Sequence, residues 1–99
     1  MGEQFEQVMN AKVEQARLGI EAEHFLASSV GQALLERAQS EYSTALLRLS
    51  EVDPFDSKEI ARLQSHAWRA DSVQGWLENI INNGREAEME IRAMEGTDA

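Results

Sequence analysis

One stretch organises this chain: residues 57–94, which read SKEIARLQSHAWRADSVQGWLENIINNGREAEMEIRAM. Apolar residues recur in it mostly three or four positions apart, which is the spacing of a helix that buries one stripe against another helix. This seam consists of Ile60, Leu63, Ala67, Ala70, Leu77 and Ile81, widened by Val73, Ile80 and Ala87. The pattern predicts one helix over 57–94, which continues through the glycine at position 84.

The preceding segment, 30–52, predicts the partner of that helix. Its apolar seam is Leu35, Ala38, Tyr42, Ala45, Leu49 and Val52. Steps of three and four residues make this an a/d pattern of the coiled-coil kind. Pro54 cannot continue the helix, and a connection of about four residues makes antiparallel neighbours of the two helices. We therefore expect an all-α fold built on a long antiparallel helical hairpin, about 30–52 and 57–94.

The short connection also carries helix-start signals. Asp56 is expected to cap the helix over 57–94, with Glu59 three residues later completing a capping box. Phe55 and Ile60 have the spacing of a hydrophobic staple, so they are expected to pack on each other.

An N-terminal helix is predicted over about 3–26. Its apolar positions are Phe5, Val8, Met9, Val13, Ala16 and Ile20. Gly19 costs about 1 kcal/mol relative to alanine inside a helix, so a bend or fraying is expected there. Ser29 and Gln32 have the spacing of a capping box that starts the next helix. The narrow apolar face suggests that 1–26 is mobile or docks on another subunit, and packing within the chain stays an alternative.

The bulk composition bounds the rest. Ninety-nine residues predict a single domain, 1–99, too short to enclose a large substrate cavity, and 96–99 is expected to be a disordered tail. A net charge of −9 disfavours direct nucleic-acid binding and favours solubility. The sequence has no Cys, no leader and no apolar run of about 18 residues, so a soluble intracellular protein without membrane contact is expected.

No arrangement of residues indicates catalysis. We find neither a Ser/His/Asp pattern nor a glycine-rich phosphate loop, so we expect no enzyme and no cofactor. Glu21 and His24 form one Glu-x-x-His pair, which is half of a di-iron helix-bundle site. Because only one copy is present, we expect no metal centre. An oligomeric, ferritin-like Glu/His metal protein is one alternative, and an acidic inhibitor of a host nucleic-acid-binding protein is another.

One aromatic residue lies off the seam. Trp68 would be exposed on a two-helix hairpin, and tryptophan is enriched in interface cores. Contact of Trp68 with the N-terminal helix is one reading, and contact with another subunit or partner is the other. On the second reading Trp68, together with Phe5, Met9 and Val13 on the N-terminal helix, is the candidate protein interface. Trp76 stands beside Val73 and Ile80 in the pattern and is predicted to lie in the core. A hairpin alone buries little area, so we expect a homodimer or higher homo-oligomer.

Three runs carry a family resemblance: 25–38 (FLASSVGQALLERA), 52–54 (VDP) and 82–87 (NNGREA). Over about 25–94 the chain resembles small helical-hairpin proteins encoded by tailed bacteriophages and prophages. The resemblance implies a non-enzymatic virion-related or morphogenesis protein, acting as a structural, assembly or adaptor component. It also implies the host cytoplasm or the virion as its location, and a further phage or host protein as a partner beside a second copy of itself.

Overall fold

The computed structural model describes residues 2–96. In that part of the chain the fold is all-α, with helices α1 (Gly2–Ala27), α2 (Ser29–Glu51) and α3 (Ser57–Glu95) and no strand. The expected all-α class is thereby confirmed, and each predicted helix boundary lies within one residue of the observed one. The helices form two compact units. The α1 unit consists of α1 and the part of α3 from Leu77 onward, and the α2 unit consists of Ser28–Trp76.

The long helix α3 therefore serves two partners. It has 39 residues, whereas α2 has 23, so α2 can cover only about half of it. The seam predicted from 57 to 94 changes partner after Trp76, where the second half of α3 begins to pack with α1.

In the α1 unit, two glycines bring the helix backbones together. A Cβ atom on Gly84 would lie 2.7 Å from the Cα of Gly19 and 2.9 Å from the carbonyl oxygen of Gln15. Contacts this close admit no side chain at either glycine. The fraying expected as one outcome at Gly19 is not observed, since α1 stays helical through this buried position. Gly19 is tolerated because its missing side chain allows the crossing.

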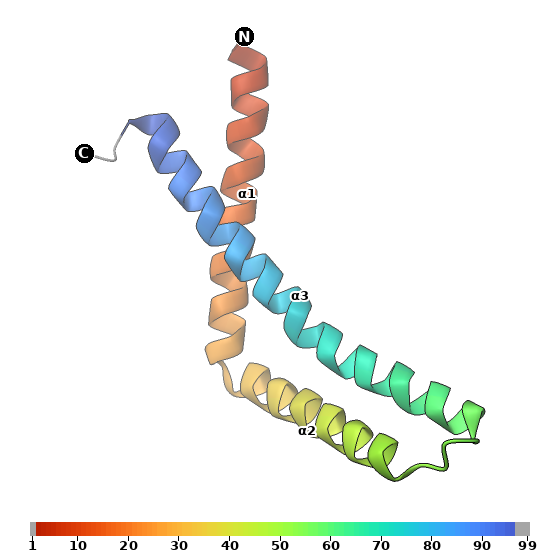
Figure 1. Cartoon of the computed structure of the whole chain (residues 1–99). Coiled ribbons are helices and arrows are strands. Elements are labelled where there is room, and N and C mark those ends of the chain that lie inside the picture. Colours follow the sequence, from red (N-terminus) through yellow and green to blue (C-terminus); the bar gives the residue numbers. More distant parts are fainter. Residues whose placement is uncertain (1, 97–99) are drawn as a thin grey trace. The chain divides into compact units, whose positions relative to one another are not determined.

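Ion pairs flank the crossing on both sides. Lys12 pairs with Glu90, and the Nε of Arg85 donates to an Oε of Glu23 at 3.0 Å. The order of these partners is reversed along the two helices, so α1 and α3 run in opposite directions within this unit (Figure 1). The first helix therefore packs on its own chain.

In the α2 unit, α2 and the first half of α3 lie side by side (Figure 1). The buried apolar residues are Ala38, Ala45, Leu63, Ala67 and Ala70. The remaining predicted seam residues of this unit are half-buried: Leu35, Tyr42, Leu49, Val52, Ile60 and Val73. Alternation of small and large residues along both helices thus gives a close but thin contact.

The connection between α2 and α3 is held by two aspartates. Asp53 accepts the N–H of Phe55 at its Oδ1 (2.9 Å), and Asp56 caps α3 by accepting the N–H of Glu59 at 3.1 Å. The rest of the predicted capping box is not formed, because Glu59 pairs with Arg62 instead. The predicted staple is also wrong, since Phe55 is 92% exposed. The turn at Asp53 fixes the backbone so that this ring lies in solvent.

Two other helix ends are defined by single residues. Ser28 caps α2 by accepting the N–H of Gly31 at 3.0 Å, one position before the predicted cap at Ser29. Gly96 follows α3 with a φ of 70°, the left-handed conformation that commonly ends helices. The rest of the predicted disordered tail, 97–99, lies outside the described residues.

Candidate functional site

The helices bury small side chains and leave large ones exposed. Among residues 2–96, the buried apolar residues are seven alanines, Leu63 and Ile81. The large exposed apolar residues of the three helices are Phe5, Val8, Val13, Leu18, Ile20, Val30, Leu34, Leu46, Leu47, Trp68, Trp76, Ile80 and Met89. Alanine removes little apolar area from water, and these large side chains keep between 40% and 69% of their surface accessible.

The two tryptophans lie in one row on α3. Trp68, Ser72 and Trp76 follow at intervals of four residues, so they share one side of the helix. Trp68 is 66% exposed and Trp76 is 61% exposed. The exposure expected for Trp68 is thus observed, whereas the core position predicted for Trp76 is wrong. Trp76 follows Trp68 by two steps of four residues, so it lies on the same side of α3, away from the seam. This spacing is the sequence signal from which the exposure of Trp76 could have been predicted.

Most residues on this side of α3 are small and uncharged, and the exposed Asp71 borders it three positions after Trp68. Ala61, Ser65, Ser72 and Gly75 share this side with the two tryptophans. Gly75 has no atom within 4 Å of the position where a Cβ would stand. Nothing within the chain therefore requires a glycine there, although glycine costs about 1 kcal/mol in a helix. We call the surface formed by these four residues and the two tryptophans the tryptophan face.

The other predicted interface residues lie on α1. Phe5, Met9 and Val13 are one turn apart and form a row near the start of this helix. Phe5 is 51% and Val13 50% exposed, and Met9 is half-buried. The structure places this row in the α1 unit and Trp68 in the α2 unit, so the four candidates are divided between the two units.

The single Glu-x-x-His pair is found on α1. Glu21 is exposed and accepts a hydrogen bond from Nη1 of Arg17 at 2.8 Å. His24 is exposed one turn further on. Within residues 2–96 no three His, Cys, Asp or Glu side chains come close enough to hold a metal ion.

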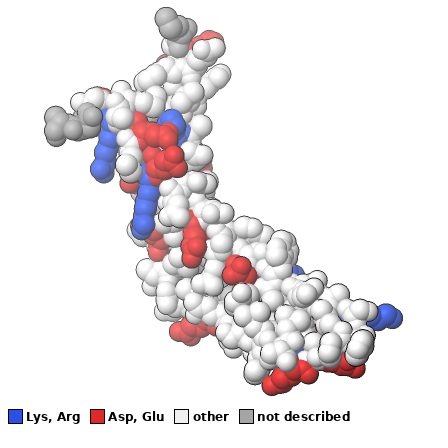
Figure 2. All heavy atoms as spheres, viewed as in Figure 1, with Lys and Arg blue, Asp and Glu red and all other residues white. Residues whose placement is uncertain are grey.

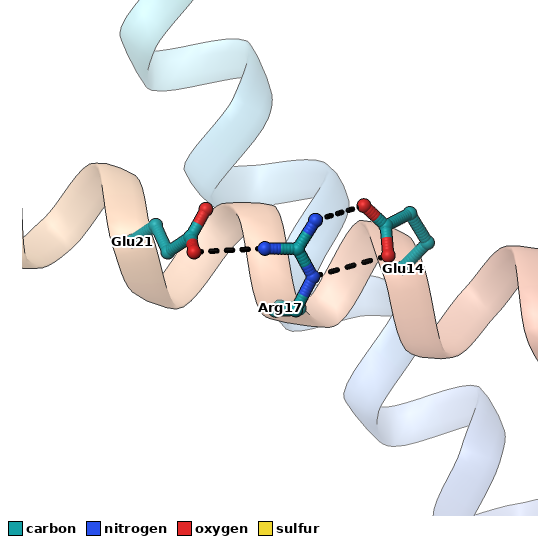
Figure 3. A network of polar contacts seen from close by, with 3 residues as sticks. All are labelled: Glu14, Arg17 and Glu21. Carbon is teal, nitrogen blue, oxygen red and sulfur yellow. Dashed lines mark hydrogen bonds and ion pairs between the residues drawn. The ribbon is translucent and has the colours of Figure 1, made fainter.

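Arg17 organises an ion network on the exposed face of α1 (Figure 3). It donates to Glu14 through two nitrogens and to Glu21 through a third. The hydrogen bond from Arg17 lowers the pKa of Glu14, and the same contact raises the pKa of the Arg17 guanidinium. Likewise, the hydrogen bond from Arg62 lowers the pKa of Glu59 at the start of α3.

These shifts predict a selective response to acid. A depressed pKa in the folded state means that each pair stabilises its helix above the unfolded pKa of glutamate, and that this contribution is lost as pH falls through the folded value. NMR titration of the side-chain carboxyl carbons should therefore find Glu14 and Glu59 titrating below the usual glutamate range. Arg17→Gln should return Glu14 to that range and leave Glu59 lowered. An unchanged Glu14 midpoint in this variant would show that the pair does not form in solution.

Acidic residues are spread over the molecule. The helices of the α1 unit carry ten acidic and four basic residues, and the α2 unit carries seven and five. On the face seen in Figure 2, acidic side chains stand singly or in small groups, with wide uncharged areas between them. On this face the distribution differs from the massed acidic surface of a nucleic-acid mimic.

Comparisons with known proteins leave the function to be argued from this geometry. The sequence matches no family model, and searches of curated proteins and of solved structures find no match. In the described part of the chain, no helix combines the length and apolar character needed to cross a membrane.

Proposed function

We propose that this chain is a non-enzymatic assembly or adaptor protein that acts through helix–helix contacts and associates with a second copy of itself. The observation that carries the proposal is the contrast between a core of alanines and two exposed tryptophans in one row. α2 and the first half of α3 would form an antiparallel hairpin whose thin core is supplemented by oligomerisation. In small proteins with little buried area, oligomerisation is a common remedy.

The tryptophan face suits a second copy for electrostatic reasons. Two chains of net charge −9 repel each other, and a face made mostly of uncharged residues brings few like charges into opposition. A two-fold axis is the commonest symmetry for such a pair. With a full area of at most about 250 Å² for one tryptophan, the two exposed rings offer about 300 Å² per chain. A specific interface buries roughly 1,200 Å² in total, and the tryptophan rings of two copies alone would supply about half of that area.

The resemblance to small helical proteins of tailed bacteriophages supports a role in virion assembly. On this proposal the protein acts in the host cytoplasm or on the virion, and a further phage or host protein is its second partner. Phe5, Met9 and Val13 on α1 offer a second apolar row for that contact.

Removal of either tryptophan should weaken self-association. In Trp68→Ala or Trp76→Ala we expect a loss of about 2 kcal/mol in dimer affinity, roughly thirtyfold, because a tryptophan at the centre of an interface contributes about that much. Sedimentation equilibrium over a range of micromolar concentrations measures this loss. Far-UV circular dichroism should show unchanged helix content, since both side chains are exposed in the single chain.

A matched control is provided by Phe55, an exposed aromatic residue in the connection that lies off the tryptophan face. Phe55→Ala should leave the dimer affinity unchanged. If the unaltered protein sediments as a monomer at every concentration, or if Phe55→Ala weakens association as much as Trp68→Ala, self-association through this face is ruled out.

A further inference from the structure

The α2 unit carries a groove along the side of the contact between its two helices. A hollow of about 280 Å³ is lined by Leu34, Arg37, Ala38, Glu41, His66, Arg69, Ala70 and Val73. A second hollow of about 230 Å³ is lined by Ser40, Glu41, Thr44, Ala45, Arg48, Arg62, Leu63 and His66. Glu41 and His66 line both hollows, so the two hollows adjoin along the helix contact, and together we call them the groove. None of its residues belongs to the tryptophan face.

The rim of this groove is basic. Arg37 and Arg69 line the first hollow, and Arg48 and Arg62 line the second. These are four of the nine Lys and Arg residues of a chain with 18 acidic residues. Glu41 is the single acidic residue of the lining, and it accepts a hydrogen bond from Arg37 at 3.1 Å.

Two of the four arginines have no carboxylate of their own. Within residues 2–96, Arg48 and Arg69 make no ion pair, although carboxylates outnumber basic groups two to one. Arg62 pairs with Glu59. The pKa of Glu59 is lowered mainly by the hydrogen bond from Arg62 and to a smaller extent by the positive charge of Arg48. The groove therefore offers unpaired guanidinium groups to an anion from outside the chain.

The floor and length of the groove fit a helix. Ala38, Ala45 and Ala70 line its base, and small residues allow a third helix to approach at the usual 8–10 Å. Leu34 and Val73 supply an apolar end. Arg62 and Arg69 are two turns apart, about 10 Å, and Arg37 and Arg48 are three turns apart, about 16 Å. Carboxylates spaced two to three turns along a docked helix would face these pairs.

We propose that this groove binds an acidic amphipathic helix of another protein, with its apolar stripe on the alanine floor and its carboxylates on the arginine rim. Arginine favours carboxylates because its planar fork can donate two parallel hydrogen bonds. This site is separate from the face assigned to self-association, and it holds whether or not the chain forms a dimer.

Two other occupants fit less well: the exposed face of α1 from a second copy, and a nucleic acid. The exposed face of α1 carries Arg17 between Glu14 and Glu21 (Figure 3), so docking it would place a cation opposite the arginine rim. A nucleic acid would be attracted by the rim but repelled by a chain of net charge −9. A short acidic helix meets the rim without carrying a long phosphate backbone past the rest of the surface.

The test is direct binding of a synthetic probe to the full chain. The probe is a fluorescently labelled helical peptide of about 20 residues, with an alanine and leucine stripe flanked by glutamates two and three turns apart. Fluorescence anisotropy should show binding that weakens as salt rises. The double variant Arg48→Gln/Arg69→Gln should weaken it about thirtyfold, since each contact to a charged group is a strong one. Lys58→Gln removes a charge from the same unit but not from the groove, and it should leave the affinity unchanged.

Several results would overturn the proposal: no binding to the unaltered chain, equal losses in Lys58→Gln and the double variant, or equal binding of a peptide whose glutamates are moved onto the apolar stripe. Tighter binding of a single-stranded oligonucleotide would assign the groove to nucleic acid instead. A change in sedimentation of the double variant alone would assign it to a second copy. Circular dichroism should confirm that each variant keeps its helix content.

Discussion

Gly84→Leu is expected to separate α1 from α3 and to lower the free energy of unfolding by about 3 kcal/mol, which is the upper part of the usual range for overpacking. Even the first carbon of the new side chain would stand 2.7 Å from the Cα of Gly19. The neighbouring atoms are backbone, so no rotamer change relieves the clash. Leucine is a good helix former, so a lower free energy of unfolding would result from the clash where α1 and α3 cross and not from a lower helix propensity. Urea unfolding followed by far-UV circular dichroism measures it.

The same substitution at two glycines of α3 provides the control. Gly84→Ala should destabilise the protein, because its Cβ meets backbone at 2.7 Å and 2.9 Å. Gly75→Ala should stabilise it by about 0.5–1 kcal/mol, since that position is open and alanine is the better helix former. The same substitution on the same helix is therefore expected to lower the free energy of unfolding at Gly84 and to raise it at Gly75. Equal stabilisation at both positions would show that α1 and α3 do not cross at Gly84 in solution.

Leu63→Ala is expected to lower the free energy of unfolding by about 2–5 kcal/mol. Leu63 is 3% exposed and is the largest buried side chain between α2 and α3. The surrounding buried residues are alanines, which cannot move into the cavity that the substitution leaves. The same urea titration measures the loss.

Leu47→Ala is the matched control in the same unit, because this leucine of α2 is exposed and surface substitutions usually stay within about 0.5 kcal/mol. Leu49→Ala should fall between the two, since Leu49 is half-buried. A loss below about 0.5 kcal/mol at both Leu63 and Leu49 would reject the seam between α2 and α3.

The helices themselves could be predicted from local patterns. Steps of three and four between apolar residues located α2 and α3, and Pro54 ended α2 because proline cannot continue a helix. The cap at Asp56 was also predictable from the local sequence, since an aspartate before a helix accepts a hydrogen bond from a free N–H of its first turn. The staple was not: whether Phe55 packs on Ile60 depends on the turn that Asp53 imposes on the backbone, and there the ring lies in solvent.

The candidate interface was predictable in part. Trp68 stood out because it is a large aromatic residue off the seam, and its exposure followed from that position. Trp76 was misplaced because its nearness to Val73 and Ile80 in the sequence outweighed its four-residue steps from Trp68. The groove of the α2 unit could not be found from spacing alone, since its basic rim combines arginines from two helices that meet only in the packed unit.

By itself, the sequence determined the number of helices, their limits and the charge of the chain, because helix periodicity, caps and breakers act over a few neighbouring residues. Only the tertiary structure decided which helix covers the second half of α3. Gly19 and Gly84 lie 65 positions apart in the sequence. Judged by helix propensity alone, each is expected to destabilise its own helix. In the folded chain they are the two positions where backbones can meet, because a missing side chain destabilises an isolated helix and permits the closest packing between two.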